Sequence, residues 1–172
     1  FVPDEVRGYF AEQLEYWRNV EADWHALFER YRQAYPDLAQ QFEEVMSGRL
    51  PAGWKDKLPQ FSPAKPIATR SASGDVMNAI AAAVPAFIGG SADLAPSTKT
   101  YLKGQGDQQK ETPGGRNLHY GVREHGMGAI VNGMAVHGGV KPFGATFFVF
   151  SDYMRPSVRL SALMEIPSVW IF

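Results

Sequence analysis

The sequence contains no cysteine, which excludes disulfide bonds and thiolate metal sites. It also carries almost no net charge, because 17 Lys and Arg against 18 Asp and Glu give −1 at pH 7. This balance offers no electrostatic basis for binding nucleic acid or an anionic membrane surface. No apolar run reaches the roughly 20 residues of a transmembrane helix. We therefore expect no nucleic-acid partner and no membrane partner, and the default compartment is the cytoplasm.

Both ends of the sequence are unusual for a complete protein. Residue 1 is Phe, with no targeting segment before it, and residues 167–172 have the pattern of a buried strand with no turn after it. The composition, 45% hydrophobic and 20% charged, is that of a folded chain. Because domains rarely end inside a core strand, we expect an internal fragment of a longer protein.

The first third of the sequence has a helical pattern. Apolar residues recur at steps of three and four from Asp4 to Tyr35, which predicts a long amphipathic helix. Pro36-Asp37 interrupts it, and a shorter helix is predicted to end at Gly48. Residues 49–66 hold several prolines and no periodicity, so they form a connecting segment. The aromatic stripe of the long helix is interpreted as a packing face.

From residue 68 onward, helical patterns alternate with short apolar strands. This alternation indicates an α/β fold with a parallel sheet. Ligands of such sheets bind at the carboxyl ends of the strands. Helices are predicted at 68–84, 122–136 and 151–164, strands at 85–89, 140–148 and 167–172, an exposed polar loop at 96–117, and a strand-end loop at 89–93.

Three stretches carry residues suited to chemistry, and the first is 89–94. It follows a predicted strand and begins with two glycines, which permit close approach of the backbone to a ligand. Ser91 and Asp93 supply a hydroxyl and a carboxylate. Taken alone, the pattern is more typical of a tight turn with a helix cap.

The second stretch is 119–127, with Glu124 at the start of a predicted helix. Taken alone, such a residue is more typical of a surface acid stabilised by the helix dipole. Gly121 and Gly126 are unusual here, because glycine weakens a helix unless another group must come close. The histidines of this region are not at metal-ligand spacing, so no metal site is predicted.

The third stretch places Phe147, Phe150 and Tyr153 at every third position across a strand-to-helix junction. This spacing allows one side of a pocket to be wholly aromatic. Taken alone, the same spacing is more typical of core packing.

Together these stretches resemble the transketolase family, in its order and at its approximate spacing. The resemblance implies an α/β parallel-sheet pyrimidine-binding domain, partial, over residues 63–172. It also implies a helical arm from the diphosphate-binding domain over residues 1–62, on features at Val2-Pro3, Trp17 and 34–36. The stretches that carry the resemblance to the domain are 67–70, 89–97, 119–127, 145–153 and 158–163.

The resemblance implies a cofactor, thiamine diphosphate, and roles toward it. Glu124 matches the glutamate that hydrogen-bonds N1′ of the aminopyrimidine and favours its imino tautomer, which requires a protonated carboxyl in a dry site. Phe147, Phe150 and Tyr153 match the aromatic pocket around that ring. Asp93 matches an acid near the cofactor that helps to hold the active dimer.

The resemblance also implies substrates and missing parts. Arg70 and Ser91 match the pair that binds the sugar phosphate. The family's Gly-Asp-Gly motif and downstream Asn, which hold the diphosphate and Mg²⁺ or Ca²⁺, are absent from this sequence. The metal ligands are therefore expected outside this chain. Because the family's active sites lie between the subunits of a homodimer, the chain would supply only one side of the site and be inactive alone.

The activity implied is transfer of a two-carbon ketol unit from a ketose phosphate to an aldose phosphate. Two alternatives stay open. One is a related enzyme such as dihydroxyacetone synthase or deoxyxylulose-phosphate synthase, against which Arg70 with Ser91 favours a phosphosugar enzyme. The other is a non-catalytic module that retains the fold, against which Glu124 and the aromatic residues argue.

Overall fold

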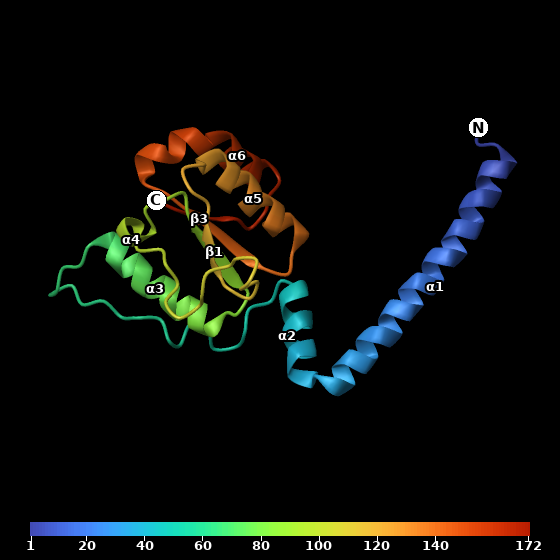
Figure 1. The fold of residues 1–172 in the computed structure, drawn as a ribbon, viewed down its shortest axis with the longest axis horizontal. Helices are drawn as coiled ribbons and strands as arrows, with labels where there is room; N and C mark the ends of the chain where they lie inside the picture. The colour runs from blue at the N-terminus through green and yellow to red at the C-terminus, as the bar shows by residue number, and fades with distance from the viewer. The chain divides into compact units, whose positions relative to one another are not determined.

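The structure is a computed structural model that describes residues 1–172 (Figure 1). The chain divides into two compact units, Phe1–Glu43 and Glu44–Phe172. The first unit is helical, with α1 spanning Asp4–Ala34 and α2, Pro36–Met46, beginning one residue after Tyr35. The predicted long helix and the shorter helix after it are both confirmed.

Aromatic side chains stack along the first unit. The rings of Trp24 and Phe28 lie 5.4 Å apart and nearly parallel, and Phe42 of α2 lies 5.3 Å from Phe28. Arg32 forms one ion pair with Glu29, also in α1, and a second with Glu43. The second ion pair joins the end of α1 to α2. No residue of α1 is buried. The aromatic stripe is therefore exposed along most of its length, and its interpretation as a packing face stays a prediction.

The second unit is built on a parallel four-stranded sheet in the order β2-β1-β3-β4, which confirms the predicted α/β fold. Three longer helices and two short helices accompany it. Its strands are β1 (Phe87–Ser91), β2 (Asn117–His119), β3 (Lys141–Ala145) and β4 (Val169–Ile171). Its helices are α3 (Thr69–Ala83), α4 (Ala95–Thr98), α5 (Glu124–His137), α6 (Ser151–Leu163) and the 3₁₀ helix η1 (Phe148–Phe150).

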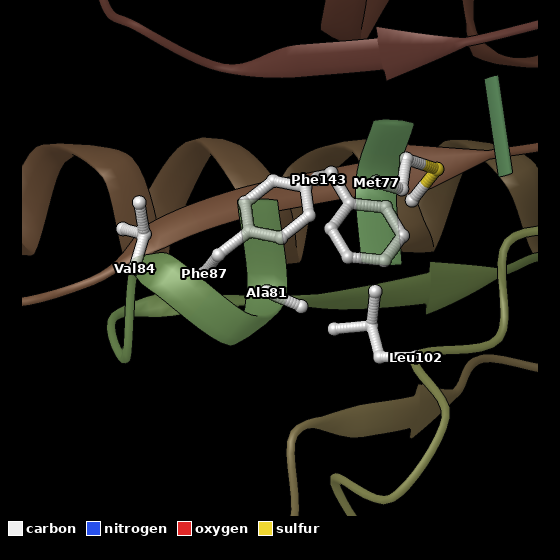
Figure 2. Packing of buried hydrophobic residues seen from close by; sticks show 6 residues of the cluster. All are labelled: Met77, Ala81, Val84, Phe87, Leu102 and Phe143. Carbon is white, nitrogen blue, oxygen red and sulfur yellow. The ribbon is translucent and has the colours of Figure 1, made fainter. Parts of the chain in front are cut away.

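The sheet has a core on each face. Figure 1 shows α3 on one side of the sheet and α5 with α6 on the other. On the α3 side, Met77 and Ala81 pack against Phe87 and Phe143, whose rings lie 4.8 Å apart (Figure 2). On the other side, the core consists of Ala92, Tyr120, Met127, Val131 and Met154. Both faces are covered, as is usual for a parallel sheet.

The predicted strand ends were wrong around β1. The strand runs two residues further than predicted, so Gly89, Gly90 and Ser91 belong to it and not to a loop. A Cβ atom on Gly89 would lie 2.1 Å from the Phe143 carbonyl oxygen, and one on Gly90 would lie 1.8 Å from the Leu118 carbonyl oxygen. The glycines are needed for close approach of neighbouring strands, whereas the sequence interpretation assigned that closeness to a ligand.

The predicted exposed loop at 96–117 was also partly wrong. It contains α4 and the start of β2, and Leu102 is completely buried. The Asn117 side chain explains the burial, because its amide accepts a hydrogen bond from Leu102 N at 2.7 Å and donates one to Leu102 O at 2.9 Å. At the other boundary, β3 ends at Ala145, three residues before the predicted end of that strand.

Candidate functional site

The ends of three strands bring the predicted stretches to one edge of the sheet. Ser91, the last residue of β1, pairs with His119 at the end of β2 and with Ala145 at the end of β3. The segments that follow, with Asp93, Glu124 and Phe147, therefore leave from one edge, here named the carboxyl edge. The chain passes from β1 to β2 on one side and then to β3 on the other, and such a reversal is where open α/β sheets bind ligands.

Glu124 is the first residue of α5 and is only 8% exposed. Its carboxyl group makes no hydrogen bond or ion pair within the chain, since the neighbouring Arg123 donates instead to the Tyr120 carbonyl oxygen at 2.9 Å. Gly121, at φ +67°, makes the turn that leads into the helix. The carboxyl oxygens of Glu124 still reach solvent, since the Tyr120 hydroxyl is the one fully buried side-chain polar atom without a hydrogen bond, so the carboxyl group is open to a polar atom of a ligand.

Phe147, Phe150 and Tyr153 form a continuous series, here named the aromatic row. The ring centroids of Phe147 and Phe150 lie 6.3 Å apart, and those of Phe150 and Tyr153 lie 6.1 Å apart. Core packing does not account for the row, because Tyr153 is 66% exposed. Phe148 and Val149 are exposed beside it, so an apolar surface flanks the carboxyl edge.

Asp93 lies two residues beyond the end of β1, in a strained backbone. Asp93 and Leu94 have φ values of +63° and +58°, a left-handed conformation that non-glycine residues rarely adopt. Each residue held in such a conformation lowers the stability of the fold by about 1–3 kcal/mol, and such residues are concentrated at ligand sites. The Asp93 side chain is exposed and makes no hydrogen bond in the chain, so its carboxylate is free for a ligand or another protein surface.

The structure does not bring Ser91 and Arg70 together through any hydrogen bond. The Ser91 side chain lies in the sheet, and its hydroxyl group contacts the carbonyl oxygens of Ala145, at 3.0 Å, and of Asp93. Its residue exposure is only 4%. Arg70 lies in the first turn of α3 and is exposed, with no ion pair. The hydroxyl of Ser91 thus supports the strand end, while the Arg70 guanidinium is open to solvent.

A second serine of the same region is more accessible. Ser97 of α4 is exposed, and the preceding Ala95 and Pro96 line a hollow of about 300 Å³ together with Ser71, which follows Arg70 in α3. The sequence interpretation singled out Ser91, although both serines belong to the matched stretch 89–97. Only the pairing of β1 with β3 distinguishes the buried hydroxyl from the exposed one.

A larger groove of about 540 Å³ lies at the carboxyl edge, lined by Asp93, Tyr101 and His119 among others. On its rim, His119 Nε2 lies 2.9 Å from Asp107 Oδ1, and the Tyr101 hydroxyl donates to the same oxygen at 3.1 Å. The hydrogen bond with His119 lowers the pKa of Asp107, and Asp107 in turn raises the pKa of Tyr101. These contacts fasten the segment between α4 and β2 to the end of β2. No sequence pattern predicted them.

No three His, Asp or Glu side chains lie close enough together to hold a metal ion. None of the helices combines the length and the apolar character that crossing a membrane requires.

Comparison with known proteins gives a consistent family. Residues 65–172 match the family model described as the pyrimidine binding domain of transketolase. A transketolase from Halalkalibacterium halodurans is 50% identical over 171 residues, which are 99% of this chain and 26% of that protein. A chloroplastic transketolase from Arabidopsis thaliana is 49% identical over 99% of this chain and 23% of its own length.

The solved structures agree. A transketolase from Pichia stipitis in complex with sedoheptulose 7-phosphate superposes with a TM-score of 0.92 at 42% identity, covering 99% of this chain and 26% of the other. The chain thus spans about a quarter of the length of the relatives it matches. Since both the sequence and the fold agree over nearly its whole length, the chain belongs to the transketolase family.

Proposed function

We propose that this chain is part of a transketolase and forms the pyrimidine side of its thiamine diphosphate site. The intact protein transfers a two-carbon ketol unit from a ketose phosphate to an aldose phosphate. The observation that carries this proposal is Glu124, a mostly buried residue whose carboxyl group has no partner in the chain and reaches solvent at the carboxyl edge of the sheet. The names of the relatives, and the sugar phosphate in the Pichia stipitis structure, support it.

The residues at the carboxyl edge fit the pyrimidine end of this cofactor. An aminopyrimidine needs one hydrogen-bonding acid at a ring nitrogen and an apolar surface against its face, and Glu124 and the aromatic row supply these two features. When bound, thiamine diphosphate supplies the carbanion chemistry of ketol transfer.

Glu124 holds a proton against N1′ of the ring in this proposal. One proton between the carboxyl group and N1′ makes this hydrogen bond, and the bound ring would close the carboxyl group off from water. No protein group competes for the hydrogen bond, because Arg123 is engaged with the Tyr120 carbonyl oxygen. Glu124 is the proposed catalytic residue of the chain.

The aromatic row and Asp93 orient the cofactor. Phe147, Phe150 and Tyr153 pack against the ring and exclude water from the Glu124 carboxyl, which strengthens the hydrogen bond to N1′. Asp93 lies near the cofactor and contributes to the contact between subunits of a homodimer. Its exposed carboxylate and strained backbone support this role.

Arg70 binds the phosphate of the sugar substrate. A guanidinium group matches the geometry of a phosphate dianion, and Arg70 has no competing partner. Ser91 was predicted to share this role, yet its hydroxyl faces two carbonyl oxygens inside the sheet. Ser97 is the more accessible hydroxyl, because it is exposed and lines the groove at the carboxyl edge, while its neighbours Ala95 and Pro96 also line the hollow beside α3.

Several features of the intact enzyme are proposed from family membership. Mg²⁺ or Ca²⁺ holds the diphosphate through ligands outside this chain, and the active form is a homodimer. The 172-residue chain alone is inactive. The proposed compartment is the cytoplasm, although a plant relative is chloroplastic, and localisation of the tagged full-length protein in its source cells tests this.

Two alternative functions share part of these features. A dihydroxyacetone synthase or a deoxyxylulose-phosphate synthase shares the cofactor, but the relatives reported above are transketolases at 49–50% identity. A non-catalytic module that retains the fold would need neither the unpaired Glu124 carboxyl group nor the exposed aromatic row beside it, and both are present.

Glu124→Gln in the full-length protein tests the proposed function. Glutamine keeps the volume and can donate a hydrogen bond to N1′, so cofactor affinity falls only modestly. It cannot transfer a proton, so we expect kcat to fall by roughly 10²–10⁴-fold. The direct measurement is hydrogen–deuterium exchange at the thiazolium carbon, with cofactor occupancy checked separately. Exchange at the wild-type rate would show that Glu124 is only a structural acid at a helix start.

A further inference from the structure

The first turn of α5 is held by one side chain of α6. Ser157 is only 2% exposed, and its hydroxyl oxygen lies 3.0 Å from His125 Nδ1 and 3.2 Å from the His125 carbonyl oxygen. His125 directly follows Glu124 and is the second residue of the helix. A single buried hydroxyl group therefore contacts both the backbone and the side chain next to the proposed catalytic residue.

One protonation arrangement satisfies both contacts. If His125 Nδ1 carries a proton, it donates to Ser157 Oγ, which in turn donates its own proton to the His125 carbonyl oxygen. In the other neutral tautomer, Nδ1 is an acceptor. The single hydroxyl proton of Ser157 can then be donated either to Nδ1 or to the carbonyl oxygen of His125, and one of these acceptors stays without a donor. The geometry therefore favours a continuous chain of hydrogen bonds from the imidazole through Ser157 to the backbone of α5.

Two further residues of α5 meet Ser157. A Cβ atom on Gly128 would lie 2.5 Å from Ser157 Cβ, so only glycine allows this approach of the two helices. Asn132 Nδ2 donates to the Ser157 carbonyl oxygen at 2.8 Å. Because residues spaced by three and four share a helix face, His125, Gly128 and Asn132 present one continuous surface to Ser157.

The contact joins the two elements that carry the proposed cofactor residues. The helix α5 begins with Glu124, whereas α6 directly follows Phe150 and carries Tyr153 in its first turn, one turn before Ser157. We propose that Ser157 is a positioning residue that fixes Glu124 relative to the aromatic row. This inference rests on the proposed function, since it assigns the geometry of the same acid.

Ser161 provides a matched control on the same helix. It is 6% exposed, and its hydroxyl oxygen lies 2.7 Å from Asn132 Oδ1 and 3.0 Å from the Ser157 carbonyl oxygen. It has no hydrogen bond with the first turn of α5. Removing either hydroxyl group therefore costs comparable stability, but only Ser157→Ala releases the residue beside Glu124.

The test uses the full-length protein with Ser157→Ala, Ser161→Ala, Glu124→Gln and the Ser157→Ala/Glu124→Gln double variant. At saturating cofactor, we expect Ser157→Ala to slow exchange at the thiazolium carbon by about 10- to 100-fold, the effect of a small misplacement of a catalytic group. Ser161→Ala is expected to exchange at nearly the wild-type rate, with a similar loss in Tm. In the Glu124→Gln background, Ser157→Ala should add little, because its effect passes through that acid.

A second readout needs no cofactor. In the apoprotein, hydrogen-exchange mass spectrometry of the peptide beginning at Glu124 should show faster deuterium uptake for Ser157→Ala than for Ser161→Ala. Ser157→Cys keeps a weak donor of similar size, so it should partly restore both the exchange rate at the thiazolium carbon and the slow deuterium uptake of the peptide. It replaces Ser157→Ala in the test if that variant does not fold.

The outcomes separate the two hypotheses. Equal effects of the two serine variants, or a full additional effect of Ser157→Ala in the Glu124→Gln background, would reduce Ser157 to a packing residue. Wild-type exchange by Glu124→Gln alone overturns the proposed function instead.

Discussion

The guanidinium group of Arg116 donates a hydrogen bond to the carbonyl oxygen of Ala81, 2.8 Å away, in the last turn of α3. It also donates to the carbonyl oxygens of Val84 and Pro85, each at 3.0 Å. The last carbonyl groups of a helix lack partners within the helix, so Arg116 closes α3 from a residue far along the sequence. The same side chain lies directly before β2 and so joins the helix to the edge strand.

Replacing Arg116 by methionine should destabilise the second unit without changing the residues of the carboxyl edge. Three carbonyl groups lose a charged donor, so we expect a loss of about 2–4 kcal/mol in the free energy of unfolding. Arg116→Lys should recover only part of it, because an ammonium group cannot reach several carbonyl oxygens in a plane. Urea unfolding measures both variants. A loss below about 0.5 kcal/mol, the usual effect of a surface substitution, would contradict the capping role.

The aromatic row should contribute to cofactor affinity. Phe150→Ala removes the central ring, so we expect thiamine diphosphate to bind about 5- to 100-fold more weakly, corresponding to about 1–3 kcal/mol of lost apolar contact. Titration of the full-length apoprotein measures this. Phe148→Ala is the control, since Phe148 is 74% exposed and lies on η1 outside the row. Unchanged affinity with lowered stability for Phe150→Ala would mean that the ring is part of the core.

Arg70→Ala should discriminate phosphorylated from unphosphorylated substrates. Loss of a charge-assisted contact costs about 1.5–3 kcal/mol, so KM for sugar phosphates should rise roughly 10- to 100-fold, with little change for the free sugars. Steady-state kinetics with matched substrate pairs measures the difference. Equal effects on both substrate types would refute the assignment.

The two serines near β1 should behave differently in the same assay. Ser97→Ala should raise KM for sugar phosphates at unchanged stability, because its hydroxyl is exposed. Ser91→Ala should instead lower the Tm, because its hydroxyl joins the ends of β1 and β3. If Ser91→Ala raises KM for sugar phosphates at unchanged Tm, the sequence assignment of Ser91 to the phosphate is restored.

The contact of Asp107 with His119 should add to stability only above strongly acidic pH. The hydrogen bond with His119 lowers the pKa of folded Asp107 from 3.8, so the folded state favours the charged form. The contribution is therefore present above about pH 4 and lost as the pH falls through the lowered value. Asp107→Asn should reduce stability near neutral pH, and the difference from the wild type should shrink below about pH 4. Unfolding curves across this range measure it, and a difference independent of pH would exclude the hydrogen bond to the charged Asp107 carboxylate as its cause.

Local patterns were sufficient to predict the larger elements. The steps of three and four in α1 follow from its helical period, and the apolar spacing of α3, α5 and α6 follows from burial of one helix face, so both are visible in a short window of the sequence. The strand β2 was missed because it has only three residues, Asn117–His119, whose order comes from pairing with β1. Such short strands lack a periodic signal of their own.

The site residues were found by a different route. Nothing around Glu124 marks it as buried, and it was identified only because several stretches occur together in the family's order. Ser91 was assigned to the substrate phosphate by the resemblance. Its burial could not be foreseen from the sequence, because it depends on a contact with Ala145, 54 residues away. The contact between Ser157 and His125 spans 32 residues and likewise has no local signature. Sequence patterns identified the chemistry of the site, but its supporting contacts required the three-dimensional structure.

The tight approach of strands at Gly89 and Gly90 limits how this enzyme family can be redesigned. Neither position accepts even one added carbon atom, because the space is already filled by the backbone of β3 and β2. A mutant library that randomises these two positions would consist almost entirely of misfolded proteins. Attempts to change the range of sugars accepted should therefore vary exposed positions such as Ser97 and leave strand β1 unchanged.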